Sequence, residues 1–358
     1  MIRVLHVFHE MANGGIEHFV MDYYRHIDRT RIQFDFLVSV DTEGYFDNEI
    51  RKLGGKVFHA YPLKKNPIKN YLDIARIVEE NNYQIVHRHT GSAFGYFDLR
   101  AARKGGAKKL IIHSHNNQAG NRFIHKISSV FFRIPCNKLA CSYEAGQWLF
   151  NGDCDFKVIN NAIDCNKFRF RKEIREKIRT ELKIENQFVI GHVGRFENQK
   201  NHIRMIQIFK EVNEKYKNSV LLLIGIGALQ NECKELAFDL RLSDKIMFLD
   251  ARSDVQDIMQ AFDVFLLPSF YEGFPFVLVE AQASGLTCVV STNVPKECNI
   301  TGNVCFVDLK KSNSEWSNII LSKHDGNLDR SKYADEMIGQ GYDIYQNAEK
   351  LCDYYESL

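Results

Sequence analysis

Short apolar runs alternate along this chain with longer stretches in which apolar residues recur at helical spacing. The runs favour buried strands, and the stretches between them favour amphipathic helices. Strands are expected at 4–8, 34–40, 84–87, 110–113, 188–193, 220–224, 246–249, 264–267 and 287–291. Helices are expected at 17–26, 71–81, 203–215, 230–240, 255–262 and 277–283. Because such alternation produces parallel sheets with helices on both faces, the pattern predicts an α/β protein.

The alternation stops in a charged stretch near 165–185 and then begins again. A chain of 358 residues is long enough for two domains with separate cores. We therefore predict a first domain over 1–168 and a second over 169–340, each built on its own parallel sheet. The last segment, 341–358, has helical spacing, and we expect it to form a helix that packs back on the first domain.

The formal net charge of +2 hides an asymmetry between the two halves. Residues 1–170 contain 24 Lys and Arg against 17 Asp and Glu, whereas the remainder contains 23 against 28. The nine cysteines include no C-x-x-C pair, and the first residues resemble a buried strand instead of a signal peptide. We expect free thiols and a cytoplasmic protein, soluble or peripheral to a membrane, with no nucleic-acid partner.

The segment PSFYEGFPFVLVEA, which begins at Pro268, follows an expected strand and contains two carboxylates. Glu272 should lie at the carboxyl ends of parallel strands, where such sheets bind ligands. The amides of Gly273 and Phe274 open the next helix and are suited to an anion, and Pro275 suits its first turn. Glu280 lies farther inside that helix. Each carboxylate can accept two hydroxyl hydrogen bonds from a sugar or a ribose, although a solvated loop and a surface helix would explain them equally well.

Two cations follow the expected strand 188–193. In the segment GRFENQK, Gly194 allows the backbone to pass close to a ligand, and Arg195 and Lys200 supply positive charge. A departing diphosphate requires such charge as its bond breaks. Arg195 can bind it through two parallel hydrogen bonds and Lys200 as a point charge. Without other information, two surface cations beside a helix start would be an equally good interpretation.

A tight turn with the sequence Asn13-Gly14-Gly15 follows the first expected strand. It does not match the dinucleotide-binding pattern G-x-G-x-x-G. Backbone amides at Gly15 can still face a phosphate, because the turn precedes a helix. The simpler alternative is that the two glycines only permit the turn.

Two His-x-His pairs lie near strand ends: His87 with His89, and His113 with His115. Residues two apart in a strand face the same way, so each pair could bind zinc. No carboxylate ligand accompanies either pair, and a structural hydrogen-bonding role is the simpler alternative. The D-x-D sequence of Asp153 and Asp155 is a short match that lies far from the other motifs. We therefore predict no metal site.

The E-x7-E segment around Glu272 and the G-R-x4-K segment around Arg195 resemble the motifs of glycosyltransferase family 4, in particular its bacterial capsule and exopolysaccharide branch. The resemblance covers essentially the whole chain. It implies the GT-B fold, two facing Rossmann-like domains with a cleft between them. It also implies a retaining, metal-independent transfer from a nucleotide diphosphate sugar, expected to be a UDP-sugar, without a cofactor.

The resemblance also assigns roles to residues. The donor site would comprise Gly15, Gly194, Arg195, Lys200, Glu272, Gly273, Phe274 and Glu280, with Glu272 on the sugar and Glu280 on the ribose. The family places one histidine of the first domain beside the reacting sugar; His115 is the first choice and His113 the second. The residues implied to act in catalysis are Glu272, His115, Arg195 and Lys200. Gly14, His89 and His113 would lie on the acceptor side.

The stretch 122–135 combines an apolar and a basic stripe at helical spacing. It belongs to the interval between Asp98 and Glu144, which contains nine basic residues and no acidic one. Such a helix can lie on an anionic membrane, and a helix packed inward on the sheet is the alternative. A polyprenyl-diphosphate-linked glycan at the inner membrane face would be a fitting acceptor. A sugar-nucleotide epimerase or hydrolase and a non-catalytic partner subunit are the alternative functions, with a metallohydrolase third.

Overall fold

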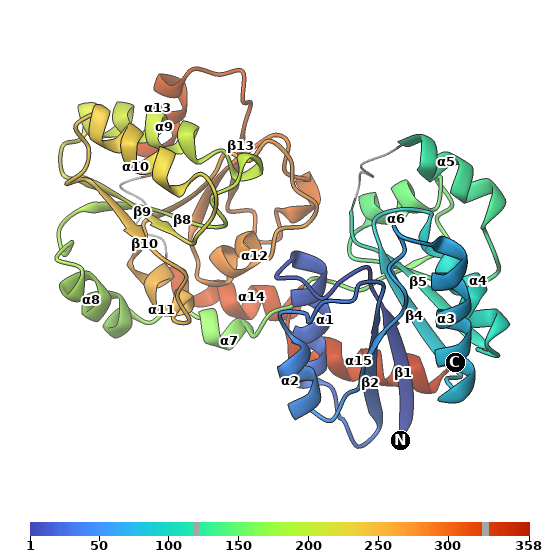
Figure 1. Ribbon diagram of the computed structural model, residues 1–358. Coiled ribbons are helices and arrows are strands. Elements are labelled where there is room, and N and C mark those ends of the chain that lie inside the picture. The colour runs from blue at the N-terminus through green and yellow to red at the C-terminus, as the bar shows by residue number, and fades with distance from the viewer. Residues whose placement is uncertain (117–121, 324–328) are drawn as a thin grey trace. The chain divides into compact units, whose positions relative to one another are not determined.

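The computed structural model describes residues 1–116, 122–323 and 329–358 and divides into two compact units (Figure 1). The first unit comprises Met1–Ala162 and Ile344–Leu358, and the second comprises Ile163–Asp343. The division falls several residues before the boundary expected at 168. The reason is that Ile163 pairs with Asp343 in a parallel bridge, which joins this stretch to the second unit.

The first unit is built on a seven-stranded sheet in the order β3-β2-β1-β4-β5-β6-β7, with every pair parallel. The strands are β1 (Ile2–Val7), β2 (Ile32–Val38), β3 (Val57–His59), β4 (Ile85–Thr90), β5 (Lys109–Ser114), β6 (Asn137–Ala140) and β7 (Lys157–Val158). The strand order reverses between β1 and β4. Sheets of this kind bind ligands outside the carboxyl ends of the strands at that point.

Helices cover both faces of this sheet (Figure 1). They are α1 (Gly15–His26), α2 (Asp47–Lys52), α3 (Pro67–Glu80), α4 (Gly95–Lys104), α5 (Arg122–Phe131), α6 (Tyr143–Leu149) and α15 (Ile344–Glu356). The helix α1 packs against α15, and α3 packs against α4. Alternate strand residues such as Leu5 and Val86 join the core formed with α3 and α4. The residues between them, including His6 and His87, face α1 and α15.

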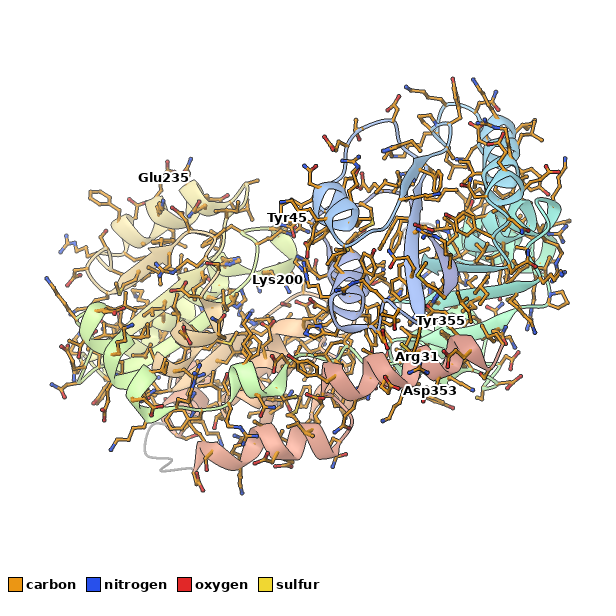
Figure 2. All side chains as sticks on the ribbon, turned by 90° about the horizontal axis from the view of Figure 1, so that it is seen from below. Arg31, Tyr45, Lys200, Glu235, Asp353 and Tyr355 are labelled. Carbon is orange, nitrogen blue, oxygen red and sulfur yellow. The ribbon has the colours of Figure 1, made fainter. Side chains whose placement is uncertain are left out.

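The final helix α15 is an integral part of the first unit. Arg31, at the start of β2, forms ion pairs with Glu349, Asp353 and Glu356 of α15 at 2.5–2.7 Å, and Figure 2 shows Arg31 beside Asp353. The hydroxyl of Tyr355 is hydrogen-bonded to Nδ1 of His87 in β4 at 2.7 Å. The sheet face that carries His6 and His87 is therefore closed by the last residues of the chain.

The second unit repeats the same topology in a six-stranded parallel sheet, β10-β9-β8-β11-β12-β13. Its strands are β8 (Phe188–Val193), β9 (Ser219–Ile224), β10 (Ile246–Leu249), β11 (Val264–Leu267), β12 (Thr287–Ser291) and β13 (Val304–Val307). Its helices are α7 (Cys165–Phe168), α8 (Lys172–Glu181), α9 (His202–Lys215), α10 (Gln230–Asp239), α11 (Val255–Ile258), α12 (Phe276–Ala283), α13 (Asn313–Leu321) and α14 (Tyr333–Gly339). The short turns η1 (Asn198–Lys200), η2 (Met259–Ala261), η3 (Lys296–Cys298) and η4 (Arg330–Lys332) complete it.

The α/β prediction is confirmed, and the nine strands expected from the sequence are all present. The strands β3, β6 and β7 were missed because each is short and includes a polar residue, so no continuous apolar run marks them. The strand β13 was also missed, although its sequence VCFV is apolar. All nine cysteines are free, as expected. Within the described residues, no helix combines the length and apolar character that crossing a membrane requires.

Candidate active site

The loops after β8 and β11 are bound to each other because these two strands are neighbours in the second sheet. The amide of Phe270 donates to the carbonyl of Gln199 at 2.9 Å, and the side chain of Asn201 donates to the carbonyl of Pro268 at 3.0 Å. Asn201 adopts the left-handed conformation that begins α9. The two motif segments predicted from the sequence therefore meet at the carboxyl edge of the sheet.

Glu272 and Lys200 form an ion pair in this loop cluster. Nζ of Lys200 donates to Oε1 of Glu272 at 2.7 Å, and the two side chains are only 17% and 5% exposed. The hydroxyl of Ser269 donates to the same oxygen at 2.6 Å, and Nε2 of Gln199 donates to Oε2 at 3.2 Å. The carboxylate is thus fixed by three donors from the two motif loops. Such charge-assisted hydrogen bonds are strong when they are shielded from water.

Arg195 is the exposed cation of the same loop. Its side chain is 59% exposed and pairs with Glu197 at 3.1 Å. Gly194 precedes it, and the chain after β9 lies directly on this loop. A Cβ on Gly225, which has a φ of +137°, would lie 2.2 Å from the carbonyl oxygen of Gly194. Glycine is therefore required at Gly225 for the two loops to touch.

The helix α12 follows the loop of Glu272. Pro275 is its N-cap with a ψ of 119°, so the helix begins at Phe276, one residue before the expected range 277–283. Gly273 and Phe274 precede this cap, and Phe274 is buried and stacks on Tyr342. Glu280 lies in the middle of α12 and is partly exposed. Gly285, with a φ of +69°, follows the C-cap Ser284 and ends the helix.

The first unit contributes a second helix start. Gly14 is the N-cap of α1, and Gly15 is its first residue. A Cβ on Gly15 would meet no atom within 4 Å, whereas one on Gly14 would lie 2.5 Å from a carboxylate oxygen of Glu17. The space above Gly15 is open, and the amides of this turn can approach an anion there.

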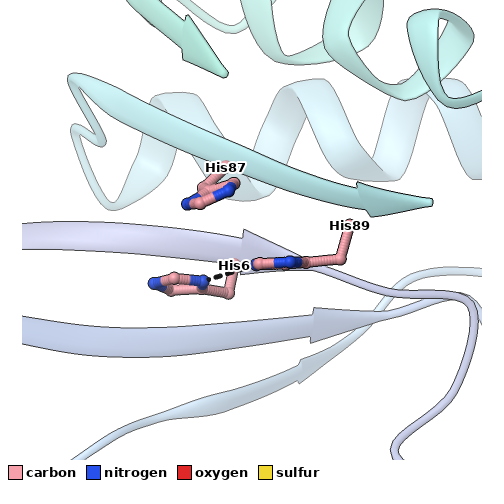
Figure 3. Close-up of side chains that lie close together, drawn as sticks. All are labelled: His6, His87 and His89. Atoms are coloured by element: carbon pink, nitrogen blue, oxygen red, sulfur yellow. Dashed lines mark hydrogen bonds between the residues drawn. The ribbon is translucent and has the colours of Figure 1, made fainter. Parts of the chain in front are cut away.

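Five histidines form two layers beneath α1 and α15. Four of them, His6, His87, His89 and His113, are at most 2% exposed, and His115 is 7% exposed. In one layer, Nε2 of His89 is hydrogen-bonded to Nδ1 of His6 at 2.9 Å, and Nδ1 of His89 to Nε2 of His115 at 2.9 Å. In the other layer, Nε2 of His87 is bonded to Nδ1 of His113 at 3.2 Å. Figure 3 shows His6 and His89 joined end to end, with His87 stacked beside them.

The layers resemble a hydrogen-bonded stack more than a metal centre. Ring nitrogens of three histidines lie within 4.8 Å of one another in two groups. A metal ion needs lone pairs that converge, and each imidazole lone pair lies in the plane of its ring. The planes of His87 and His89 differ by only 24°, and those of His113 and His115 by 27°. The lone pairs of stacked rings therefore run side by side instead of converging.

The D-x-D sequence is also engaged by protein groups. Oδ2 of Asp153 accepts from Lys138 at 2.6 Å and from Arg133 at 3.1 Å. These cations occupy the oxygen that a divalent ion would need. Their position agrees with the interpretation of this motif as a chance match.

Comparison with known proteins identifies the family. The model of "Glycosyltransferase Family 4" matches residues 13–167, and that of "Glycosyl transferases group 1" matches residues 173–304. EpsF of Bacillus subtilis, which is provisionally assigned as a glycosyltransferase, is 32% identical over 99% of this chain and 96% of its own length. This chain belongs to the family 4 glycosyltransferases.

Other relatives of this glycosyltransferase are similar over nearly its full length. A UDP-Gal:alpha-D-GlcNAc-diphosphoundecaprenol alpha-1,3-galactosyltransferase of Escherichia coli is 28% identical over 90% of this chain and 89% of its own. Among solved structures, HepE of Anabaena in complex with UDP has a TM-score of 0.82 at 20% identity, with both chains fully covered. The predicted GT-B fold class, with its two parallel Rossmann-like sheets, is confirmed.

Two histidines predicted for the acceptor side of the glycosyltransferase are buried. His89 and His113 were expected on the acceptor side, yet they are 2% and 1% exposed. Both are covered by Phe19 of α1, whose ring lies 6.4 Å and 5.1 Å from theirs. His115 is the member of the stack that retains exposure.

Sequence reasoning also missed several contributors to these two clusters. Ser269 and Gln199 lie inside the motif segments, but only the folded loops show that both donate to Glu272. His6 is an isolated histidine in a buried strand. Only the strand register shows that His6 belongs to the histidine cluster, because His6 lies opposite His87 in the β1–β4 pair.

Proposed function

We propose that this glycosyltransferase transfers a sugar from a UDP-sugar to a lipid-linked glycan of bacterial polysaccharide synthesis, with retention at the anomeric carbon. The observation that carries the proposal is the buried Lys200–Glu272 pair beside the start of α9. It combines a carboxylate for sugar hydroxyls with a cation for a diphosphate. The donor and acceptor classes are supported by the name of the Escherichia coli relative and by HepE structures with UDP and with UDP-glucose.

In this proposal, each motif residue has one task. Arg195 and Lys200 stabilise the negative charge that develops on the departing diphosphate. Glu272 accepts hydrogen bonds from hydroxyl groups of the donor sugar, and Glu280 accepts them from the ribose. Gly15 and Gly194 let backbone amides approach phosphate oxygens. His115 donates a hydrogen bond to the reacting sugar.

The reaction would need no protein nucleophile. The bond between the anomeric carbon and the diphosphate oxygen breaks, and the acceptor hydroxyl forms its bond on the same face of the sugar. The released diphosphate oxygen takes the acceptor proton. Because Lys200 and Arg195 supply the positive charge, we propose that no divalent metal takes part.

The test is a donor screen in which released nucleoside diphosphate is measured with and without polyprenyl-diphosphate-linked glycan. We expect release from one UDP-sugar, dependent on the lipid acceptor and unchanged by EDTA. Equal release with water alone would favour a hydrolase, and no release with any donor would favour a non-catalytic subunit. Loss of activity in EDTA, restored by Mg²⁺ or Mn²⁺, would contradict the metal-independent mechanism.

The helix α5 supports the membrane part of the proposal because its apolar side chains face solvent. Phe123 and Val130 are 72% and 76% exposed. The face turned inward is instead polar: His125 stacks on Trp148 with centroids 4.7 Å apart, and Ser128 and Ser129 are buried. This exposure supports the membrane role over the alternative in which the apolar stripe packs on the sheet. An exposed apolar stripe flanked by cations suits an anionic lipid surface.

We expect this protein to bind vesicles that contain anionic lipid and to be released by high salt. Each Lys or Arg near such a surface contributes about 1 kcal/mol, and salt screens it. Replacing Arg122, Lys126 and Arg133 with glutamine should abolish most vesicle binding in a sedimentation assay, and replacing Phe123 and Val130 with serine should weaken it.

The matched control removes three exposed cations from the second unit, Lys172, Lys177 and Lys217. This variant has the same net charge as the first and should sediment with anionic vesicles as the wild type does. Equal binding of the wild type to neutral and anionic vesicles, or equal loss in the two triple variants, would contradict a membrane role for α5.

A further inference from the structure

Three imidazoles form a continuous hydrogen-bonded row from the interior of the first unit to His115. His6 in β1, His89 in β4 and His115 after β5 are joined through ring nitrogens at 2.9 Å in each step. The ring planes differ by 12° between His6 and His89 and by 37° between His89 and His115, and each hydrogen bond joins a nitrogen of one ring to a nitrogen of the next. One ring nitrogen remains at each end of the row: Nε2 of His6 and Nδ1 of His115.

These two end atoms have different surroundings. Nε2 of His6 is fully buried and has no hydrogen-bond partner within the described part of the chain. The ring of Phe34 lies 4.0 Å from that of His6. At the other end, His115 has the greatest exposure in the stack, and its Nε2 is already occupied by His89. Any substrate oxygen that meets this imidazole must therefore meet Nδ1.

Proton counting restricts the row to two arrangements. A neutral imidazole has one N–H donor and one acceptor nitrogen, so every hydrogen bond in the row must point the same way. If the donors point inward, His115 donates to His89 and His89 to His6, and the remaining N–H of His6 is buried without a partner. If the donors point outward, His6 donates to His89 and His89 to His115. The buried Nε2 of His6 is then unprotonated, and His115 carries its proton on Nδ1. Because buried N–H groups without partners are rarer than buried acceptors without partners, the outward arrangement is favoured.

We propose that His6 and His89 are positioning residues that hold His115 as the Nδ1–H tautomer, so that His115 presents a hydrogen-bond donor to a sugar oxygen. The inference rests on the proposed function for the identity of that oxygen. The second layer keeps the row in place: His87 stacks on His89, and His113 on His115, each with centroids 4.2 Å apart. Burial lowers the pKa of His115 to about 3, so the imidazole is neutral during the reaction.

The direct test is the tautomer of His115 in the full-length protein, measured by long-range ¹H–¹⁵N correlation with ¹⁵N-histidine labelling. The signal is assigned by its loss in His115→Asn. We expect a protonated Nδ1 and an unprotonated Nε2 in the wild type. In His89→Phe, which removes the donor to Nε2, the Nε2–H form should appear, whereas His59→Gln, an exposed histidine of the same unit, should change nothing. A wild-type His115 protonated on Nε2 would overturn the proposal.

The activity test compares His89→Phe with His89→Gln, whose amide can still donate to His115. We expect kcat to fall by about 10- to 100-fold in the phenylalanine variant, with KM nearly unchanged, as for other outer hydrogen-bond partners of an active site. The glutamine variant should recover most of that loss. Equal kcat in wild type and His89→Phe would contradict the positioning role. If the tautomer is as expected but His115→Asn keeps full transferase activity, the proposed sugar contact fails while the row itself stands.

Discussion

Replacing Lys200 by alanine is expected to lower kcat by about 100- to 1,000-fold, because one fixed donor to a developing negative charge is lost. Lys200 is held in place by Glu272 at 2.7 Å and lies directly before the first turn of α9. It is therefore oriented before any substrate arrives. Arg195→Ala should have a smaller effect, because its exposed side chain must first be ordered by the diphosphate. Steady-state kinetics with the preferred donor would measure both effects.

Variants of the two carboxylates separate the binding of the donor sugar from the binding of the nucleotide. Glu272→Gln should lower kcat strongly while leaving the affinity for UDP, measured by calorimetry, nearly intact. Glu280→Gln should do the reverse. Lys210→Ala is the matched control, since this lysine forms an exposed ion pair with Glu214 on the outside of α9. Near-normal turnover in Lys200→Ala, or UDP affinity lost in Glu272→Gln but kept in Glu280→Gln, would contradict the assigned roles.

The first unit is expected to lose stability steeply as the pH falls below 6.5. Burial lowers the pKa of His6 and of His115 to about 3, and it also lowers the pKa of His87, His89 and His113. Below pH 6.5 these histidines become protonated in the unfolded chain but stay neutral in the folded protein. The stabilisation from neutral histidines is therefore complete above pH 6.5 and is lost toward pH 3. At pH 5, His6 and His115 alone would each cost about 2 kcal/mol.

The two tryptophans allow this loss to be followed in each unit separately. Trp148 belongs to the first unit and Trp316 to the second. Urea unfolding of Trp316→Phe would report the first unit, and that of Trp148→Phe the second, at pH 7.5 and pH 5. The described residues of the second unit include fewer buried histidines, His192 and His202, so this unit should lose less. An unfolding free energy of the first unit that is unchanged between the two pH values would contradict neutral buried histidines.

Much of the second unit could be predicted from the sequence because most residues of its central strands β8, β9, β11 and β12 are buried. The strand β11 is a continuous apolar run and β8 begins with one, and each is followed by a motif whose residues differ sharply from the run. Parallel topology places both motif loops at the carboxyl edge of the sheet, but their meeting depends on the adjacency of β8 and β11, which the sequence does not reveal. The pairing of Lys200 with Glu272 did not follow from the sequence either, because charge and spacing allow Lys200 to face solvent equally well.

The histidine row could not be predicted because it depends on strand register and on the end of the chain. The sequence shows His87 and His89 on one face of a strand, but His6 joins them only when β1 and β4 are aligned. Tyr355 is more than two hundred residues away, and its bond to His87 exists only because α15 returns to the first unit. The orientation of α5 was equally hidden, since helical spacing defines two faces but not which one is buried.

The return of α15 has a consequence for how the protein emerges from the ribosome. Residues 1–162 are translated first, yet the sheet face that carries His6 and His87 is covered only in part, by α1, until α15 has been made. The second unit is continuous in sequence and can complete its fold earlier. The unit that is synthesised first is therefore completed last. Its fold is complete only when Asp353 and Tyr355 of α15 bind Arg31 and His87.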